Sequence, residues 1–216
     1  MKRRLTWTGF LLMGLILAAC TIVPIAEMEQ IQQSETFDPV TYVDGIWESQ
    51  VVPAIQEKAQ DLPTVLGAIE SNLTQAGDQY ATISQSGALN FVVKGQGTIT
   101  EVNTESRNGT AVLQLDGYDG PVAVIMQIGP LVRGDGVRDG VGFIEFGNFK
   151  EQTEFGQVSK ELNQRVADVV LSGLDLTTLA GKQVSFDGVF TIRTTNQTNI
   201  DLSEVVITPV ILNVEG

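Results

Sequence analysis

The chain has 216 residues, 43% of them hydrophobic, which is enough for one domain or two small ones with a proper core. Its 26 acidic residues outnumber the 13 basic ones and give a net charge of −13, so the surface repels nucleic acid and anionic lipid headgroups. The lack of histidine and the single cysteine exclude an internal disulfide, a His/Cys zinc site and Ser-His-Asp or Cys-His catalysis, and they disfavour an enzyme.

The amino terminus has the pattern of an export signal. Met1-Lys2-Arg3-Arg4 precedes an apolar run over residues 5–19, which is shorter than the ~20 residues that a membrane-spanning helix needs. The run ends in Leu17-Ala18-Ala19-Cys20, which resembles the lipobox of bacterial lipoproteins. This pattern predicts a signal peptide over residues 1–19, cleavage before Cys20 and lipidation of Cys20, with an uncleaved helix as the alternative. Two or more acyl chains anchor a protein firmly to a membrane.

Helical patterns follow a polar stretch. Residues 20–36 are predicted to be a lipidated tether, with a short helical start as the alternative. Asp38-Pro39 has the pattern of a helix start, and Pro53 is expected to kink or end that helix. A second helix is expected from Asp61, with Gly77 as a candidate cap. These features predict a helical subdomain over residues 37–85.

The rest of the chain reads as strands and turns. Apolar or alternating segments predict strands at residues 88–94, 98–104, 111–115, 122–128, 141–146, 182–194 and 204–214. Asn108-Gly109 predicts a hairpin turn, and Pro209 predicts an edge strand or a bulge. A helix is expected over residues about 148–171. The overall fold class is therefore α+β, with residues 86–216 forming a small β-barrel that carries one inserted helix.

The glycine-rich stretch from Gly129 to Gly140 is the most distinctive part of the chain. It holds four charged side chains in seven residues, namely Arg133, Asp135, Arg138 and Asp139. Glycines let a backbone approach a ligand closely, and arginine binds carboxylate or phosphate through two parallel donors. We therefore interpret these residues, together with Gln127, as a candidate ligand-binding site. The alternative is an internal Arg–Asp network that holds the loop in place.

Other candidate sites have weaker support in the sequence. Asp135 and Asp139 lack the carboxylate density of a calcium loop, so neither a metal nor another cofactor is expected. Several acids could form the paired carboxylates of a glycoside hydrolase, although a solvated face explains them better: Glu101, Glu105, Glu145, Asp187 and Glu204. Trp47 lies on the apolar stripe of the first helix, which indicates core packing rather than stacking on a sugar.

Several short motifs spread along the chain resemble one known family. They are the lipobox, Phe37-Asp38-Pro39, Ile46-Trp47, Asp61-Leu62-Pro63, Gln127-Ile128-Gly129-Pro130, Arg133-Gly134, Arg138-Asp139, Phe146-Gly147-Asn148-Phe149 and Thr208-Pro209-Val210. Together they are similar to the predicted periplasmic lipoproteins of unknown function (domain-of-unknown-function family 2291). The resemblance implies an amino-terminal helical subdomain, an OB-like β-barrel with an inserted helix, and an accessory role near sugar-type ABC transporters.

The expected function is that of a membrane-anchored extracytoplasmic lipoprotein, which acts without catalysis as an accessory or binding protein of the cell envelope. Its partners would be the membrane, through the lipid on Cys20, and a small polar solute or a transporter component, but not nucleic acid. The anchor would lie in the cell membrane or in the outer membrane facing the periplasm. A glycan-acting hydrolase with paired carboxylates and a purely structural envelope protein are the alternatives.

Overall fold

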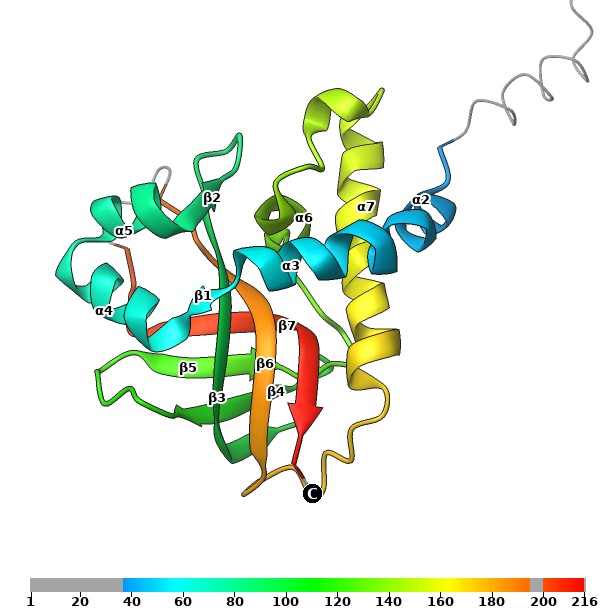
Figure 1. Cartoon of the computed structure of the whole chain (residues 1–216). Coiled ribbons are helices and arrows are strands. Elements are labelled where there is room, and N and C mark those ends of the chain that lie inside the picture. The colour runs from blue at the N-terminus through cyan, green and yellow to red at the C-terminus, as the bar shows by residue number, and fades with distance from the viewer. Residues whose placement is uncertain (1–36, 195–199, 216) are drawn as a thin grey trace, which may run out of the picture. The chain divides into compact units, whose positions relative to one another are not determined.

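The computed structural model describes residues 37–194 and 200–215, so the predicted signal, Cys20 and the tether lie outside the described residues. From Asp38 onward, the described residues form one compact unit (Figure 1). Within the described ranges, no helix combines the length and the apolar composition that crossing a bilayer requires.

The first helical segment begins where the sequence predicts but continues past Pro53. Helix α2 (Pro39–Ile46) is capped by Asp38, whose carboxylate accepts a hydrogen bond from the Val40 N–H at 3.1 Å. A π-helical turn, η1 (Trp47–Val51), then leads directly into α3 (Val52–Lys58). Pro53 stands in the first turn of α3, where its missing N–H is tolerated. The buried Trp47, only 2% exposed, confirms the predicted packing role.

The second predicted helix is two helices. Asp61 caps α4 (Leu62–Ser71) through the Thr64 N–H at 3.1 Å, as expected. The extended backbone of Asn72 ends α4, and its side chain caps α5 (Leu73–Tyr80). The prediction of a cap at Gly77 is wrong, because this glycine lies inside α5 and packs closely against Leu89.

Five strands form a closed ring. They are β3 (Leu89–Asn103), β4 (Thr110–Leu115), β5 (Ala123–Gln127), β6 (Gln183–Ile192) and β7 (Glu204–Val214). The pairing order is β3-β4-β5-β7-β6, and β6 pairs again with β3, so that the path returns to its start. Only the β5–β7 pair of this ring is parallel. Two short strands, β1 (Gln60–Asp61) and β2 (Ala81–Ile83), extend the sheet beside β3.

Strand β3 makes the closure possible. The sequence predicts separate strands at 88–94 and 98–104, but the structure shows one long strand that is shared between two neighbours. Residues 89–98 pair with β6, and residues 97–103 pair with β4. At Gly97 and Thr98 the strand is therefore paired on both sides at once.

The core fills the ring and the space under α4. Phe91 and Phe190 stack inside it with ring centroids 4.9 Å apart, and both are almost fully buried. Pro209 lies opposite a register shift between Asp187 and Gly188, which confirms the predicted bulge.

A largely helical segment connects β5 to β6. It contains α6 (Gly136–Val141), the short 3-10 helix η2 (Phe146–Asn148), α7 (Gln152–Arg165) and the π-helical η3 (Val166–Leu171). Figure 1 shows α7 as the long helix beside the barrel, close to α2 and α6. The predicted helix at 148–171 is thus confirmed in type. The strand predicted at 141–146 is wrong, because Gly142 ends α6 in a left-handed conformation (φ 79°) and the apolar side chains on either side are buried without strand pairing.

The double pairing of β3 predicts different effects for two glycines. A methyl group at Gly97 would overlap the backbone carbonyl of Gln114, whereas one at the exposed Gly67 of α4 would meet nothing within 4 Å. We expect Gly97→Ala to lower the free energy of unfolding by more than ~1 kcal/mol and Gly67→Ala to raise it by ~0.4–1 kcal/mol. Urea unfolding of both variants tests this prediction. Equal changes in the free energy of unfolding would contradict the crowding at Gly97, where β3 is paired on both sides.

Candidate functional site

The structure places the predicted binding residues around different pockets. Arg138 and Asp139, on α6, line a cleft of about 550 Å³. Gln127, Arg133 and Asp135, at the end of β5 and in the loop that follows, line a separate pocket of about 340 Å³. Arg133 and Asp135 also border a further pocket of about 430 Å³ on the side of α7. The glycine-rich stretch therefore does not form one site.

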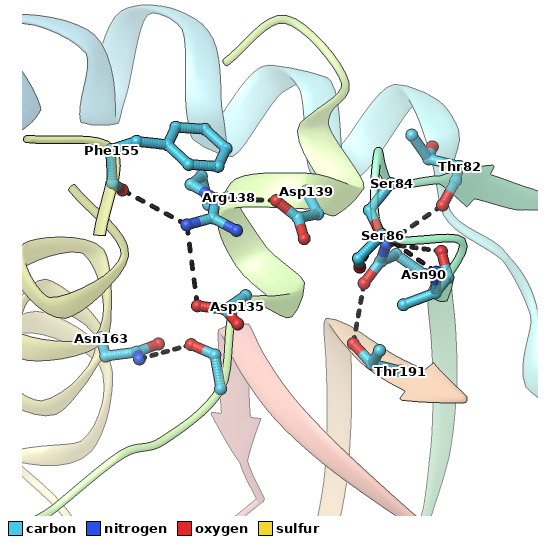
Figure 2. Close-up of polar contacts among 12 residues, drawn as sticks. Thr82, Ser84, Ser86, Asn90, Asp135, Arg138, Asp139, Phe155, Asn163 and Thr191 are labelled. Atoms are coloured by element: carbon cyan, nitrogen blue, oxygen red, sulfur yellow. Dashed lines mark hydrogen bonds and ion pairs between the residues drawn. The ribbon is translucent and has the colours of Figure 1, made fainter. Parts of the chain in front are cut away.

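Arg138 is held by its own protein. Its Nε donates to Asp139 Oδ1 at 2.7 Å, and its Nη1 donates to the Phe155 carbonyl at 3.3 Å and lies 3.7 Å from Asp135 Oδ1. The guanidinium carbon also lies over the Phe155 ring, 3.6 Å from its centroid (Figure 2). Since the side chain is only 9% exposed, its charge has lost most of its hydration, and these contacts compensate for that loss. The predicted internal Arg–Asp network is thus present.

The larger cavity, which we call the aromatic cleft, has two contrasting walls. One part of the lining comes from the end of β2 and the mostly polar residues after it, namely Thr82, Ile83, Ser84, Gln85 and Ser86. The other part includes Phe146 and Phe155 with Glu145 and Gln152. Phe146 is 39% exposed and meets Phe155 edge to face, with 5.7 Å between the centroids. The cleft therefore combines an accessible aromatic ring with hydroxyl, amide and carboxylate groups.

The polar wall is fixed to the barrel by a buried asparagine. The Asn90 amide donates to the Thr82 carbonyl at 3.1 Å and to the Ala88 carbonyl at 3.3 Å, and its oxygen accepts from the Thr191 hydroxyl at 2.8 Å. Thr82 in turn donates to the Gly140 carbonyl of α6 at 3.2 Å. These bonds tie β2 to β3, β6 and α6, as Figure 2 shows for the labelled residues, and so hold the polar side of the cleft in place.

The smaller cavity, the arginine pocket, lies over the outer face of β5, β6 and β7. Gln127 does not offer free groups there, because its Oε1 accepts from the Arg133 N–H at 2.9 Å and its Nε2 donates to the Arg133 carbonyl at 3.0 Å and to Thr208 at 2.7 Å. The buried amide instead holds the backbone of Arg133. Arg193, at the end of β6, lines the same pocket and was not expected from the sequence.

Another cavity is lined by several carboxylates. Its lining includes Asp61, Asp116, Asp187 and Lys94. In the strand register, Lys94 lies opposite Asp61 of β1 and opposite Asp187 of β6. Asp61 is used as the cap of α4, and Asp116 accepts from the Gln183 amide at 2.7 Å. In the part of the chain that the structure describes, no three acidic, histidine or cysteine side chains gather in a metal-binding arrangement.

The predicted acids are spread over the molecule. Of the five carboxylates considered for hydrolysis, Glu145 lines the aromatic cleft and Asp187 lines the carboxylate cavity. The exposed Glu101, Glu105 and Glu204 line none of these three cavities. Sequence periodicity could not identify Phe146 and Arg193 as cavity residues, since Phe146 is the last residue of the strand wrongly predicted at 141–146 and Arg193 directly follows the regular strand β6.

The pKa of Asp187 gives a prediction about pH. Burial raises this pKa above the ordinary value of 3.8, and the charge of Lys94 opposes the shift. A carboxyl with a raised folded-state pKa is least costly when protonated. Its penalty is therefore absent at pH values below the ordinary pKa of 3.8, grows as the pH rises from there to the raised value, and is complete above it. We expect Asp187→Asn to unfold at higher urea than the wild type at pH 7, with the difference shrinking towards pH 3.

Asp175 supplies the control for this experiment. Hydrogen bonds from Thr177 lower its pKa, so the ionised carboxyl stabilises the fold and that contribution is lost as the pH falls. Asp175→Asn should therefore unfold at lower urea than the wild type at pH 7, which is the opposite of Asp187→Asn. This difference should also shrink towards pH 3. If both variants show the same sign, the account of Asp187 fails.

Comparison with known proteins places the chain in a family. It is similar in structure to an OB-fold protein from Thermotoga maritima MSB8, with a TM-score of 0.66, 19% sequence identity, and coverage of 84% of this chain and 100% of that one. This likeness supports the OB-like fold. No match was found among the curated proteins. Residues 10–213 match the model of a family described as predicted periplasmic lipoproteins (DUF2291), and the chain therefore belongs to this family.

Proposed function

We propose that this lipoprotein binds a small, neutral, hydroxylated solute such as a sugar in the aromatic cleft, without catalysing a reaction. The observation that supports this proposal most is the pairing of the exposed Phe146 ring with polar side chains across one cavity. A flat ring covers the carbon-bound hydrogens of a sugar, while carboxylate, amide and hydroxyl groups exchange hydrogen bonds with its hydroxyls.

The charge distribution at the cleft favours a neutral ligand. Its one arginine, Arg138, already has its Nε and Nη1 engaged with Asp139, Asp135 and the Phe155 carbonyl. Glu145 and Asp139 add negative charge to the lining. An anionic solute would meet two carboxylates and a compensated cation, and nucleic acid would also be repelled by the net charge of −13.

The alternatives have less support. A glycan hydrolase needs two carboxylates at a defined separation on either side of the bond to be cleaved, and the Asp139 carboxylate here is the partner of Arg138. A purely structural protein agrees with the satisfied Arg138 network, but it gives no reason for the open cleft beside that network. An accessory role beside a sugar-type ABC transporter would be consistent with a sugar ligand.

The proposal predicts a ligand-dependent rise in stability. We expect one member of a panel of neutral sugars, present at 100 times its dissociation constant, to add about 2.7 kcal/mol, or roughly 5–10 °C in thermal unfolding of the full chain in detergent. Phe146→Ala should remove this shift and leave the unliganded melting temperature nearly unchanged, because the ring is 39% exposed.

The matched control is Val169→Ala, which trims a 53% exposed apolar side chain on η3, away from the lining of the cleft. It should retain the whole shift. The binding proposal is wrong if no sugar in a broad panel raises the melting temperature, or if Val169→Ala abolishes the shift as completely as Phe146→Ala does.

We propose that Cys20 carries the lipid that holds the folded body at the membrane. Its place after Leu17-Ala18-Ala19 supports this, as does membership in a lipoprotein family. We expect Cys20→Ser to abolish incorporation of labelled fatty acid and to remove the protein from detergent-phase extracts, since no acyl chain can then form. Labelling that persists in Cys20→Ser would contradict the assignment, because the chain has no second cysteine.

A further inference from the structure

The arginine pocket has a chemistry that the proposed function does not use. It shares no lining residue with the aromatic cleft, and its charged lining consists of Arg133, Arg193 and Asp135. Two guanidinium groups against one carboxylate make this pocket locally positive in a chain whose net charge is −13. A cavity of this kind concentrates the local potential and attracts anions.

The side chain of Arg133 is held in one orientation, but only part of its hydrogen-bond donors is engaged. Its backbone is held by both polar atoms of the Gln127 side chain, and its Nε donates to Asn108 Oδ1 at 2.9 Å. An arginine carries five N–H donors, so one bond at Nε sets the plane of the guanidinium and leaves its outer nitrogens for another group. Among the described residues, no further hydrogen bond or ion pair of the Arg133 side chain is recorded.

Arg193 has a loose partner. Its Nη2 lies 3.6 Å from Asp135 Oδ2, which is longer than the ~2.7–2.9 Å of a charge-assisted hydrogen bond. The other oxygen of Asp135 faces Arg138, so the carboxylate is shared between two cations. The Arg193 side chain is 60% exposed and can turn towards a better acceptor without disturbing the core.

The floor between the two arginines is compact and neutral. It includes Thr191, Thr208 and Val206 of β6 and β7, and Thr208 is only 6% exposed. Gly136, the first residue of α6, packs against this floor, since a methyl group there would come 2.9 Å from the Thr191 hydroxyl oxygen. Both arginines thus line one pocket together with these strand residues.

We propose that the arginine pocket binds the anionic group, phosphate or carboxylate, of a small solute between Arg133 and Arg193. Arginine suits either group because its planar fork places two parallel donors on two oxygens. The two sources share one geometry here, and the experiment separates them. This site is separate from the aromatic cleft, so the test of anion binding does not depend on whether the cleft binds a sugar.

The test follows the side-chain Nε–Hε signals of arginine by NMR in the full-length, isotope-labelled protein in detergent. Inorganic phosphate and succinate are titrated separately, with chloride added to keep the ionic strength constant. We expect saturable shifts of the Arg133 and Arg193 signals with at least one anion. Shifts with phosphate alone, with succinate alone or with both support the site and identify the group that it accepts.

Three variants make the test specific. Arg133→Gln and Arg193→Gln should each weaken binding about tenfold or more, because each removes a charge-assisted contact. Arg107→Gln removes the same charge from an exposed neighbour that does not line the pocket, and it should change the affinity less than about twofold. The proposal is overturned by the absence of saturable shifts with both anions, or by an equal loss in Arg107→Gln.

Discussion

The buried guanidinium of Arg138 is the interaction on which both candidate sites depend. A charge with so little exposure is tolerated only when hydrogen bonds and counter-charges surround it. Here these come from Asp139 on the same helix, from Asp135 in the preceding loop and from the carbonyl and ring of Phe155 on α7. One side chain thereby links three parts of the β5–β6 connection: it lines the aromatic cleft itself, and its partner Asp135 lines the arginine pocket.

The fold could be anticipated where local chemistry decides the outcome. Asp38 and Asp61 cap helices as their sequence contexts indicate, Asn108-Gly109 lies in the β3–β4 hairpin, and Pro209 lies at a bulge. The errors arise where tertiary contacts override the local pattern. Glycines at the bend of β3 suggested two strands, although pairing to β6 and β4 keeps one strand continuous there.

The candidate site was harder to anticipate than the fold. The sequence brings Arg133 and Arg138 within five residues, and proximity along the chain suggested one site. The short helix α6 turns Arg138 inward, while Gln127 holds Arg133 on the other side, so the two arginines serve different cavities. The partners that complete these cavities, Phe146 and Arg193, come from segments whose sequence carries no chemical signal. Only their spatial arrangement gives them a role.

The closed ring also determines how this protein can meet its neighbours. In the described chain, each of the five ring strands has a paired neighbour on both sides over part of its length. Unpaired strand edges are templates for edge-to-edge association, and confinement of a lipoprotein to a membrane plane raises the frequency of collisions between copies. A barrel without long open edges lets many copies crowd on one membrane without adding strands to each other, and it leaves recognition of partners to the helices and loops.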